Sequence, residues 1–222
     1  MQEIDLYLYR SYIFDCDGVL LNSNRIKTKA FYTTAISYGE AEANALVQYH
    51  VRNGGISRYE KFKYFLKVIV GKKIQHNELE GLLAKYAEES KAGLMRCEIA
   101  CGLERLHKSL PHSRWLVVSG GDQKELREIF SKRGIDMFFD GGIFGSPDTK
   151  SEILSRELST FNIKKPAVFL GDSRYDYETA VKKGLDFIFI HGWSEFDGWE
   201  KYFRSKNVYA ISNIEQLIKS LK

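Results

Sequence analysis

The sequence has 222 residues, of which 44% are hydrophobic and 28% are charged, a composition typical of a globular protein with a substantial core. Its 33 Lys and Arg residues and 29 Asp and Glu residues give a net charge of +4, which is too small to indicate a nucleic-acid partner. No apolar run approaches the roughly 20 residues that cross a bilayer, and the first residues lack the pattern of a signal peptide. We therefore expect a soluble cytoplasmic protein without a nucleic-acid or membrane partner.

The first predicted strand covers residues 12–14 and runs directly into two carboxylates, Asp15 and Asp17. Gly18 then frees the backbone to turn away from the strand. In open α/β sheets, ligands bind just beyond the carboxyl ends of such strands. Asp and Gly are also common in ordinary turns, so only partners elsewhere in the chain distinguish a catalytic site from a turn.

Residues 24–95 are predicted to be almost entirely helical, because apolar side chains recur there at helical spacing. A break at 53–55 precedes Ser57, which is a predicted helix N-cap. The next helix carries an aromatic stripe that includes Phe62 and Phe65. We interpret this stripe as the packing face of a small helical bundle and not as a cofactor site.

From residue 97 onward, apolar strands, polar loops and helices alternate. The predicted strands lie at 114–118, 137–144 (with a turn), 167–170, 187–190 and early in 208–222. The predicted helices lie at 123–132, 150–161, 175–183 and at the end of the chain, with an irregular aromatic segment at 194–206. This alternation is typical of βαβ units. The predicted fold class is α/β, with a Rossmann-like core whose parallel sheet has helices on both faces, plus an inserted all-α domain.

The three cysteines, Cys16, Cys97 and Cys101, are odd in number and lack the spacing of a metal site, so we expect free thiols. Cys16 lies between two carboxylates, whose charge raises the pKa of a thiol and disfavours the thiolate. Cys16 is therefore predicted to be a spacer and not a nucleophile.

Several predicted strands end in polar side chains that converge on one edge of a parallel sheet. These are Asp15, Asp17, Ser119, Asp172 and Asp176, with Lys150 expected on the same side. Carboxylates crowded into one cleft repel one another, and a hard divalent cation with oxygen ligands removes this conflict. The expected cofactor is Mg²⁺.

The same set of residues suits the transfer of a phosphoryl group. Ser119 and the amides that follow it can donate hydrogen bonds to an anion, and Lys150 adds a positive charge. Asp15 could attack phosphorus to give an aspartyl-phosphate, while Asp17 protonates the leaving alcohol and later deprotonates water. Singly, Ser119, Lys150 and Asp176 also fit turn, solvated or helix-dipole roles, so the prediction depends on the whole set.

The chain resembles the haloacid dehalogenase-like superfamily over essentially its whole length. Residues 15–20 match the DxDGV/TL signature, Val118-Ser119-Gly120 resembles the second motif, Lys150 the third and residues 171–176 the GDSxxD fourth. Lys150 lacks the Lys-Pro pair that many relatives show. The helices between the first two motifs resemble the C1-type cap of phosphoglycolate phosphatase and β-phosphoglucomutase relatives. The expected domains are a core at 1–22 and 97–222 and a helical cap at 23–96.

By this resemblance Asp15 is the nucleophile and Asp17 the acid/base, a pair that favours a phosphatase or mutase over a dehalogenase. The resemblance implies that Asp15, the Asp17 backbone carbonyl and Asp172 hold Mg²⁺ directly, and that Asp176 acts through water. It also implies that Ser119, Gly120 and Lys150 bind the substrate's phosphoryl group.

Residues 53–58 resemble the loop by which C1 caps reach into the site. Arg58 is predicted to contact a distal anion or hydroxyl group of the substrate, and a solvated first-turn arginine is the alternative. His50 and Arg52 are further candidates. The aromatic segment around Trp193 could pack internally or form an interface.

The leading functional prediction is a Mg²⁺-dependent phosphatase acting on a small phosphorylated metabolite, for which a sugar phosphate is one candidate. A sugar phosphomutase of the β-phosphoglucomutase type is the first alternative. A non-catalytic binding or assembly module is the second, although buried carboxylates without a cation would be costly. Both a monomer and a homodimer fit the sequence.

Overall fold

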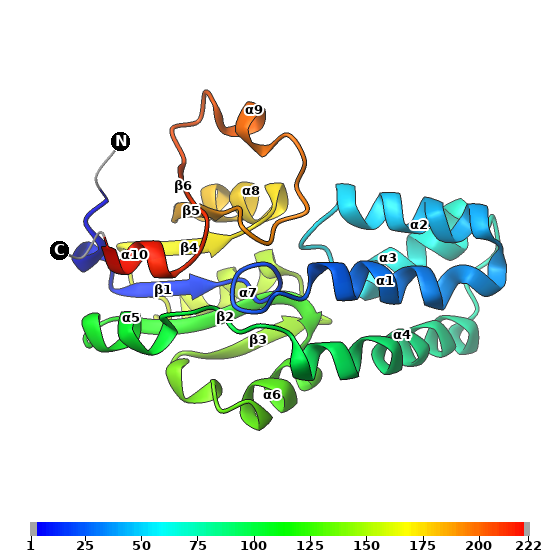
Figure 1. The fold of residues 1–222 in the computed structure, drawn as a ribbon, viewed down its shortest axis with the longest axis horizontal. Helices are drawn as coiled ribbons and strands as arrows, with labels where there is room; N and C mark the ends of the chain where they lie inside the picture. Colours follow the sequence, from blue (N-terminus) through cyan, green and yellow to red (C-terminus); the bar gives the residue numbers. More distant parts are fainter. Residues whose placement is uncertain (1–3, 220–222) are drawn as a thin grey trace.

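The computed structural model describes residues 4–219, and its centre is a six-stranded parallel sheet with the order β3-β2-β1-β4-β5-β6 (Figure 1). The strands are β1 (Ser11–Phe14), β2 (Arg114–Asp122), β3 (Gly142–Ser146), β4 (Ala167–Gly171), β5 (Asp186–Ile190) and β6 (Tyr209–Ile211). Phe14, the last residue of β1, pairs with Val117 on one side and Leu170 on the other. The carboxyl end of β1 therefore lies in the middle of one sheet edge.

Alternate residues of each strand pack on opposite faces of the sheet. Tyr12 and Phe14 join Trp115 in one core, whereas Ile13 joins Phe169 in the other. All four residues of β1 are buried, as expected for a strand covered on both sides. The predicted α/β class with helices on both faces is confirmed.

Helices pack on both faces of the sheet. Leucine side chains of α5 (Leu103–Ser109), α6 (Gln123–Lys132) and α10 (Glu215–Lys219) belong to the first core. The second core contains side chains of α7 (Lys150–Ser159), α8 (Arg174–Lys182) and α9 (Trp199–Phe203). The sheet is thus the middle layer of three.

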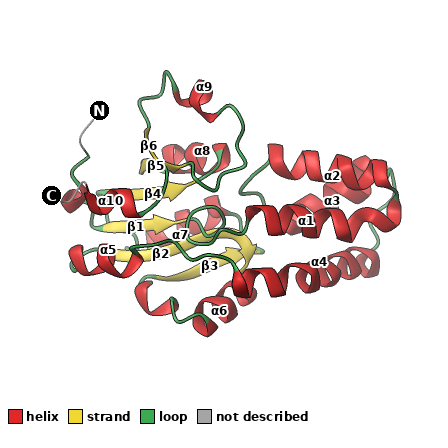
Figure 2. Cartoon of the chain, viewed as in Figure 1, coloured by secondary structure: helices red, strands yellow, loops and turns green. Residues whose placement is uncertain are grey.

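Four of the five α-helices between β1 and β2 lie beyond the carboxyl edge of the sheet (Figures 1 and 2). They are α1 (Asn24–Ala35), α2 (Glu40–Arg52), α3 (Arg58–Tyr64) and α4 (His76–Arg96), and we call them the helical insertion. The insertion has its own core, to which Phe31, Phe62 and Tyr86 contribute. Its two connections to the sheet lie side by side, since the Ala100 amide donates to the Leu20 carbonyl at 2.9 Å.

Local structure follows the sequence closely, with a few differences. Ser57 is the N-cap of α3, as predicted, but the helix widens into a π-helical turn at Phe65–Ile69, where both Phe65 and Leu66 are buried. The segment predicted as strand and turn at 137–144 begins with a 3₁₀ turn, and β3 starts only at Gly142. The 194–206 segment, predicted to be irregular, contains α9.

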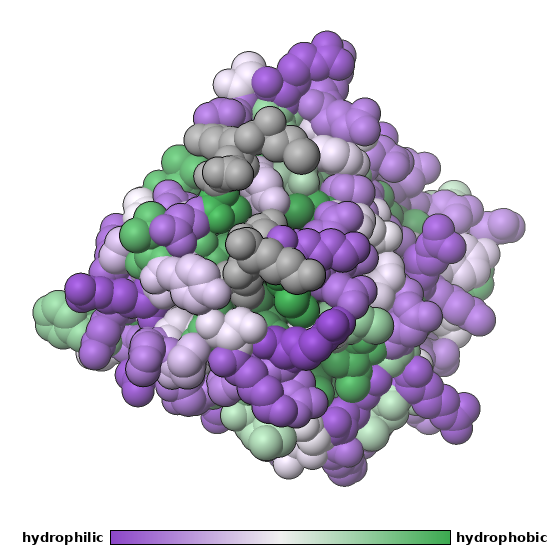
Figure 3. All heavy atoms as spheres, turned by 60° about the vertical axis from the view of Figure 1, so that its left-hand side comes forward, coloured by the Kyte–Doolittle hydropathy of each residue, from purple (hydrophilic) through white to green (hydrophobic). Residues whose placement is uncertain are grey.

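The aromatic segment around Trp193 packs internally. Trp193 contacts the first core, while Phe196, Trp199 and Tyr202 contact the second. Figure 3 shows the end of the molecule away from the insertion, where hydrophilic side chains predominate and hydrophobic ones gather in small areas. No helix within residues 4–219 has the length and apolar character needed to span a membrane.

Candidate active site

Asp15 occupies the loop that leaves β1 at the centre of the sheet edge. Its Oδ1 accepts a hydrogen bond from the Cys16 amide at 2.7 Å and lies 2.8 Å from Lys150 Nζ. Gly18 has a φ of +77°, and a Cβ atom there would lie only 2.1 Å from Asp172 Oδ2. Only glycine therefore fits the turn that brings β1 and β4 residues together.

Lys150 is the first residue of α7, where Thr149 and Glu152 form a capping box. Its fully buried ammonium lies 2.8 Å from Asp15 and 2.5 Å from Asp176. Burial disfavours the charged form of Lys150 and lowers its pKa, but the attraction of the two carboxylates is larger, and the net effect raises the pKa of Lys150. The alternative of a solvated lysine is therefore excluded.

Asp172 and Asp176 lie at the end of β4 and in the first turn of α8. Asp172 Oδ2 accepts a hydrogen bond from Asn24 of the insertion at 2.7 Å. Ser173 Oγ donates to Asp176 Oδ2 at 2.7 Å. Carboxylate oxygens of Asp15, Asp172 and Asp176 lie within 4.8 Å of one another, so the predicted convergence of Asp15 with these two residues occurs.

The three buried carboxylates form an electrostatically costly group that fits a hard cation. Burial, together with the charges of Asp15 and Asp176, raises the pKa of Asp172 well above its usual range. Burial likewise raises the pKa of Asp15, although Lys150 limits the rise. Closely spaced oxygen donors of this kind are those that Mg²⁺ prefers, and a bound cation would offset their repulsion.

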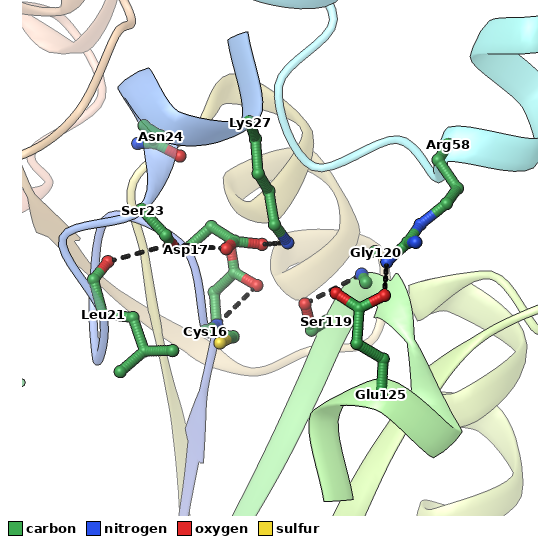
Figure 4. Close-up of polar contacts among 12 residues, drawn as sticks. Cys16, Asp17, Leu21, Ser23, Asn24, Lys27, Arg58, Ser119, Gly120 and Glu125 are labelled. Atoms are coloured by element: carbon green, nitrogen blue, oxygen red, sulfur yellow. Dashed lines mark hydrogen bonds and ion pairs between the residues drawn. The ribbon is translucent and has the colours of Figure 1, made fainter. Parts of the chain in front are cut away.

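Asp17 turns toward the helical insertion (Figure 4). Its carboxylate accepts a hydrogen bond from Ser23 Oγ at 2.5 Å and lies 2.5 Å from Lys27 Nζ. Burial alone would raise the pKa of Asp17, but Lys27 and Ser23 outweigh burial and lower it. Sequence reasoning missed both partners, although their i, i+4 spacing at the start of α1 places them on one helix face.

Ser119 and Gly120 follow the apolar part of β2. Ser119 is fully buried, and its Oγ accepts a hydrogen bond from the Gly121 amide at 3.0 Å. A Cβ atom on Gly120 would lie 2.4 Å from the Gly55 carbonyl oxygen. The loop between α2 and α3 therefore lies directly against the end of β2, as the cap-loop resemblance leads one to expect.

Arg58, at the start of α3, is buried and forms a contact between the insertion and the core. Its Nη2 lies 2.5 Å from Glu125 Oε2 of α6, and its guanidinium is 4.8 Å from the centre of the Tyr86 ring. Figure 4 shows Arg58 reaching across to Glu125. The solvated alternative for Arg58 is excluded, and sequence reasoning missed Glu125.

A cavity of about 370 Å³ lies between the sheet edge and the insertion. Its lining includes Asp15, Asp17, Gly120, Asp172, Arg58 and Lys61. The other three predicted site residues, Ser119, Lys150 and Asp176, are buried and do not line it. Lys150 therefore acts on the cavity through its contact with Asp15.

Cys16 is expected to resist alkylation in the folded protein, whereas exposed Cys101 should react. Burial, followed by the charge of Asp17, raises the pKa of the Cys16 thiol, and only the thiolate is a good nucleophile. Iodoacetamide labelling at about pH 8 with peptide mass spectrometry measures both sites. Labelling in urea is the control and should modify Cys16, while equal labelling of both thiols in the native protein would contradict the spacer role.

A family model and several solved structures resemble this chain. The family model described as haloacid dehalogenase-like hydrolase matches residues 12–190. A structure described as a predicted phosphatase from Clostridium acetobutylicum is 20% identical with a TM-score of 0.71, covering 96% of this chain and 98% of that chain. One described as a predicted phosphoglycolate phosphatase from Haemophilus somnus is 16% identical with a TM-score of 0.74, covering 98% and 100%.

A β-phosphoglucomutase from Clostridium difficile is 15% identical with a TM-score of 0.70, and the match covers 96% of this chain and 97% of that chain. At these identities the structural matches establish the fold. The comparison with curated proteins gave no match.

Proposed function

The chain belongs to the haloacid dehalogenase-like hydrolases, whose family model spans residues 12–190, and on this basis we propose that it is a Mg²⁺-dependent phosphatase. The observation that carries the proposal is the position of Asp15. Its carboxylate lines the cavity, contacts buried Lys150, and lies beside Asp172 with oxygens within 4.8 Å. A nucleophilic carboxylate held between a cation site and a lysine suits attack on a phosphomonoester.

Asp15 attacks phosphorus, a bond forms from its carboxylate oxygen, and the bond to the leaving alcohol oxygen breaks. Asp17 gives that oxygen a proton and later takes one from the water that hydrolyses the aspartyl-phosphate. The ion pair with Lys27 favours the ionised form that the second step needs. A phosphoryl dianion beside Asp17 opposes its charge and so favours proton uptake before the first step.

The remaining roles follow from the same placement. Asp15, the Asp17 backbone carbonyl and Asp172 would hold Mg²⁺, with Asp176 acting through water, and the ion would neutralise charge on the phosphoryl oxygens. We assign a contact with the phosphoryl group to Gly120, which lines the cavity, and a contact with the rest of the substrate to Arg58. Ser119 and Lys150, also predicted to bind the phosphoryl group, lie behind the cavity surface, where Ser119 Oγ accepts a hydrogen bond from the Gly121 amide and Lys150 contacts Asp15. We also propose that residues 23–96 act as the cap domain. The cavity of about 370 Å³ suits a small phosphorylated metabolite, and the cytoplasm is the location that we propose.

Phosphate release from a panel of phosphorylated metabolites and p-nitrophenyl phosphate, measured with Mg²⁺, tests the proposed function. We expect turnover of several small phosphomonoesters, since the reacting groups act on the phosphoryl end. A sugar bisphosphate in the panel distinguishes a phosphatase, which releases phosphate, from a mutase, which yields isomerised sugar monophosphate. Absence of both products across the panel would reject phosphoryl chemistry.

Removing divalent cations is expected to lower phosphatase activity at least about 100-fold, because a metal ion supplies several kcal/mol of charge stabilisation at such sites. Activity is measured after dialysis against EDTA, and re-addition of Mg²⁺ should restore it. Asp172→Asn should raise the Mg²⁺ concentration needed for half-maximal activity. The exposed Asp197→Asn is the matched control and should behave as wild type. Full activity in EDTA would contradict the metal assignment.

A further inference from the structure

The helical end of the cavity is rich in basic side chains. Five of them line it: Lys27, His50, Arg52, Arg58 and Lys61, of which Arg52 is exposed. Two of the five have carboxylate partners, because Lys27 pairs with Asp17 and Arg58 pairs with Glu125, each at 2.5 Å. Their charges are therefore already balanced within the protein.

Lys61 differs from these two residues. Its side chain is only 2% exposed, and its Nζ lies 2.7 Å from His50 Nδ1 and 5.5 Å from the centre of the Phe31 ring. Within residues 4–219, no carboxylate forms an ion pair with it. A buried ammonium without a counter-ion is costly, so the position calls for an anion from outside the chain.

The surroundings of Lys61 support an incoming anion. Burial and the charge of Lys27 lower the pKa of Lys61 to about 7. Burial and Lys61 itself lower the pKa of His50, whose neutral ring can accept a hydrogen bond from the ammonium. The other charged groups that act on Lys61 are Lys150, Asp17 and Glu195. Glu195 is held by Thr28 Oγ1, which donates to its Oε2 at 2.7 Å.

We propose that Lys61, oriented by His50, binds a second anionic group of the substrate at the helical end of the cavity. The substrate class is then a small phosphomonoester that carries a carboxylate or a second phosphate at its other end. This assignment rests on the proposed function, which places the phosphoryl group at Asp15. Asp15 and Lys61 line the same cavity, one from the sheet edge and the other from α3, so one small molecule can contact both.

Matched pairs of substrates test this subsite. ω-Carboxyalkyl phosphates of increasing chain length are compared with their primary amides, which have nearly the same shape and no terminal charge. Alkanediol bisphosphates are compared with hydroxyalkyl phosphates in the same way. At the best chain length we expect kcat/KM to be at least about tenfold higher for the anionic member of each pair. The reason is that a hydrogen bond from an ammonium to an anion is stronger than one to a neutral group. The series with the larger preference identifies carboxylate or phosphate as the second anion.

Substitution of Lys61 provides the decisive comparison. Lys61→Met and Lys61→Gln remove the charge with little change in size. In both variants the ratio of kcat/KM for the anionic substrate to kcat/KM for the neutral substrate should fall to about 1. The control Lys67→Met changes an exposed lysine of the next helical turn and should keep the ratio. Circular dichroism and thermal unfolding establish that each variant is folded. A wild-type ratio near 1, or an unchanged ratio in folded Lys61→Met, would overturn the subsite.

Phosphonate analogues, which are not hydrolysed, separate this subsite from the proposed function. Calorimetric titration with Mg²⁺ compares ω-carboxyalkylphosphonates with their amides in wild type and Lys61→Met. If no phosphomonoester is hydrolysed, the phosphatase function fails, yet a carboxylate preference that requires Lys61 still supports the subsite. If neutral esters are hydrolysed without any anionic preference, the phosphatase function stands and the subsite is rejected.

Discussion

Asp15→Asn is expected to lower phosphate release from p-nitrophenyl phosphate by more than about 10³-fold, as loss of a catalytic nucleophile does in other enzymes. An amide cannot replace the carboxylate as the attacking group, although it has almost the same size. Asp176 still pairs with Lys150 at 2.5 Å, so the variant should remain folded. Steady-state release of p-nitrophenol with Mg²⁺ measures the effect.

Two further variants are compared with Asp15→Asn. Asp17→Asn keeps the backbone carbonyl but removes the acid/base, and we expect a loss of about 10²–10⁴-fold. The exposed Asp197→Asn should retain wild-type turnover. Wild-type-like turnover by folded Asp15→Asn would refute the nucleophile assignment.

Lys150→Met is expected to lower the free energy of unfolding by about 3–5 kcal/mol, because removing one partner of a buried ion pair leaves uncompensated charge. Here both Asp15 and Asp176 lose their counter-charge. Urea denaturation in EDTA measures the change, and phosphatase activity should fall as well. The exposed Lys164→Met is the control and should change stability by less than about 0.5 kcal/mol.

The loss of unfolding free energy in Lys150→Met is expected to depend on pH. Burial raises the pKa of Asp15 in the folded protein, and removing Lys150 takes away the charge that limits the rise. A group whose folded pKa exceeds its unfolded value destabilises the fold above the unfolded pKa, and the penalty grows until the folded pKa is passed. The stability gap between wild type and Lys150→Met should therefore be smaller near pH 5 than near pH 8. An equal gap at both pH values would contradict the charge explanation.

Polar contacts join the insertion to the core beside the cavity. Besides the Arg58–Glu125 pair, Tyr59 OH donates to Asp122 Oδ2 at 2.7 Å. On the core side, Asp122 is the last residue of β2 and the N-cap of α6, and Glu125 lies in the first turn of that helix. These contacts link the position of the insertion to the strand that carries Ser119. In the proposed mechanism, an insertion held in this position would limit access of water during attack by Asp15.

Sequence reasoning predicted the fold class because its signals are local. The apolar strand before Asp15 and the later strand–loop–helix units indicate a parallel sheet without reference to distant residues. Parallel topology then places the carboxyl ends of β1, β2 and β4 at one edge, so Asp15 and Asp172 could be expected to meet. Ser57 also carries a local signal, since N-caps depend on hydrogen bonds within one turn.

The sequence by itself thus determined the α/β architecture, the helical insertion and the convergence of the carboxylates. The tertiary structure alone decided which side chains pair. The pairs Asp17–Lys27 and Arg58–Glu125 depend on how the insertion lies against the core, whereas the Lys61–His50 contact depends on how two helices pack within the insertion. These partners belong to different elements and are separated by 10, 67 and 11 residues, respectively, so residue spacing does not predict which side chains meet. Packing within the insertion leaves Lys61 beside His50 without a carboxylate, which is why the structure and not the sequence points to Lys61 as the residue that binds a second anion.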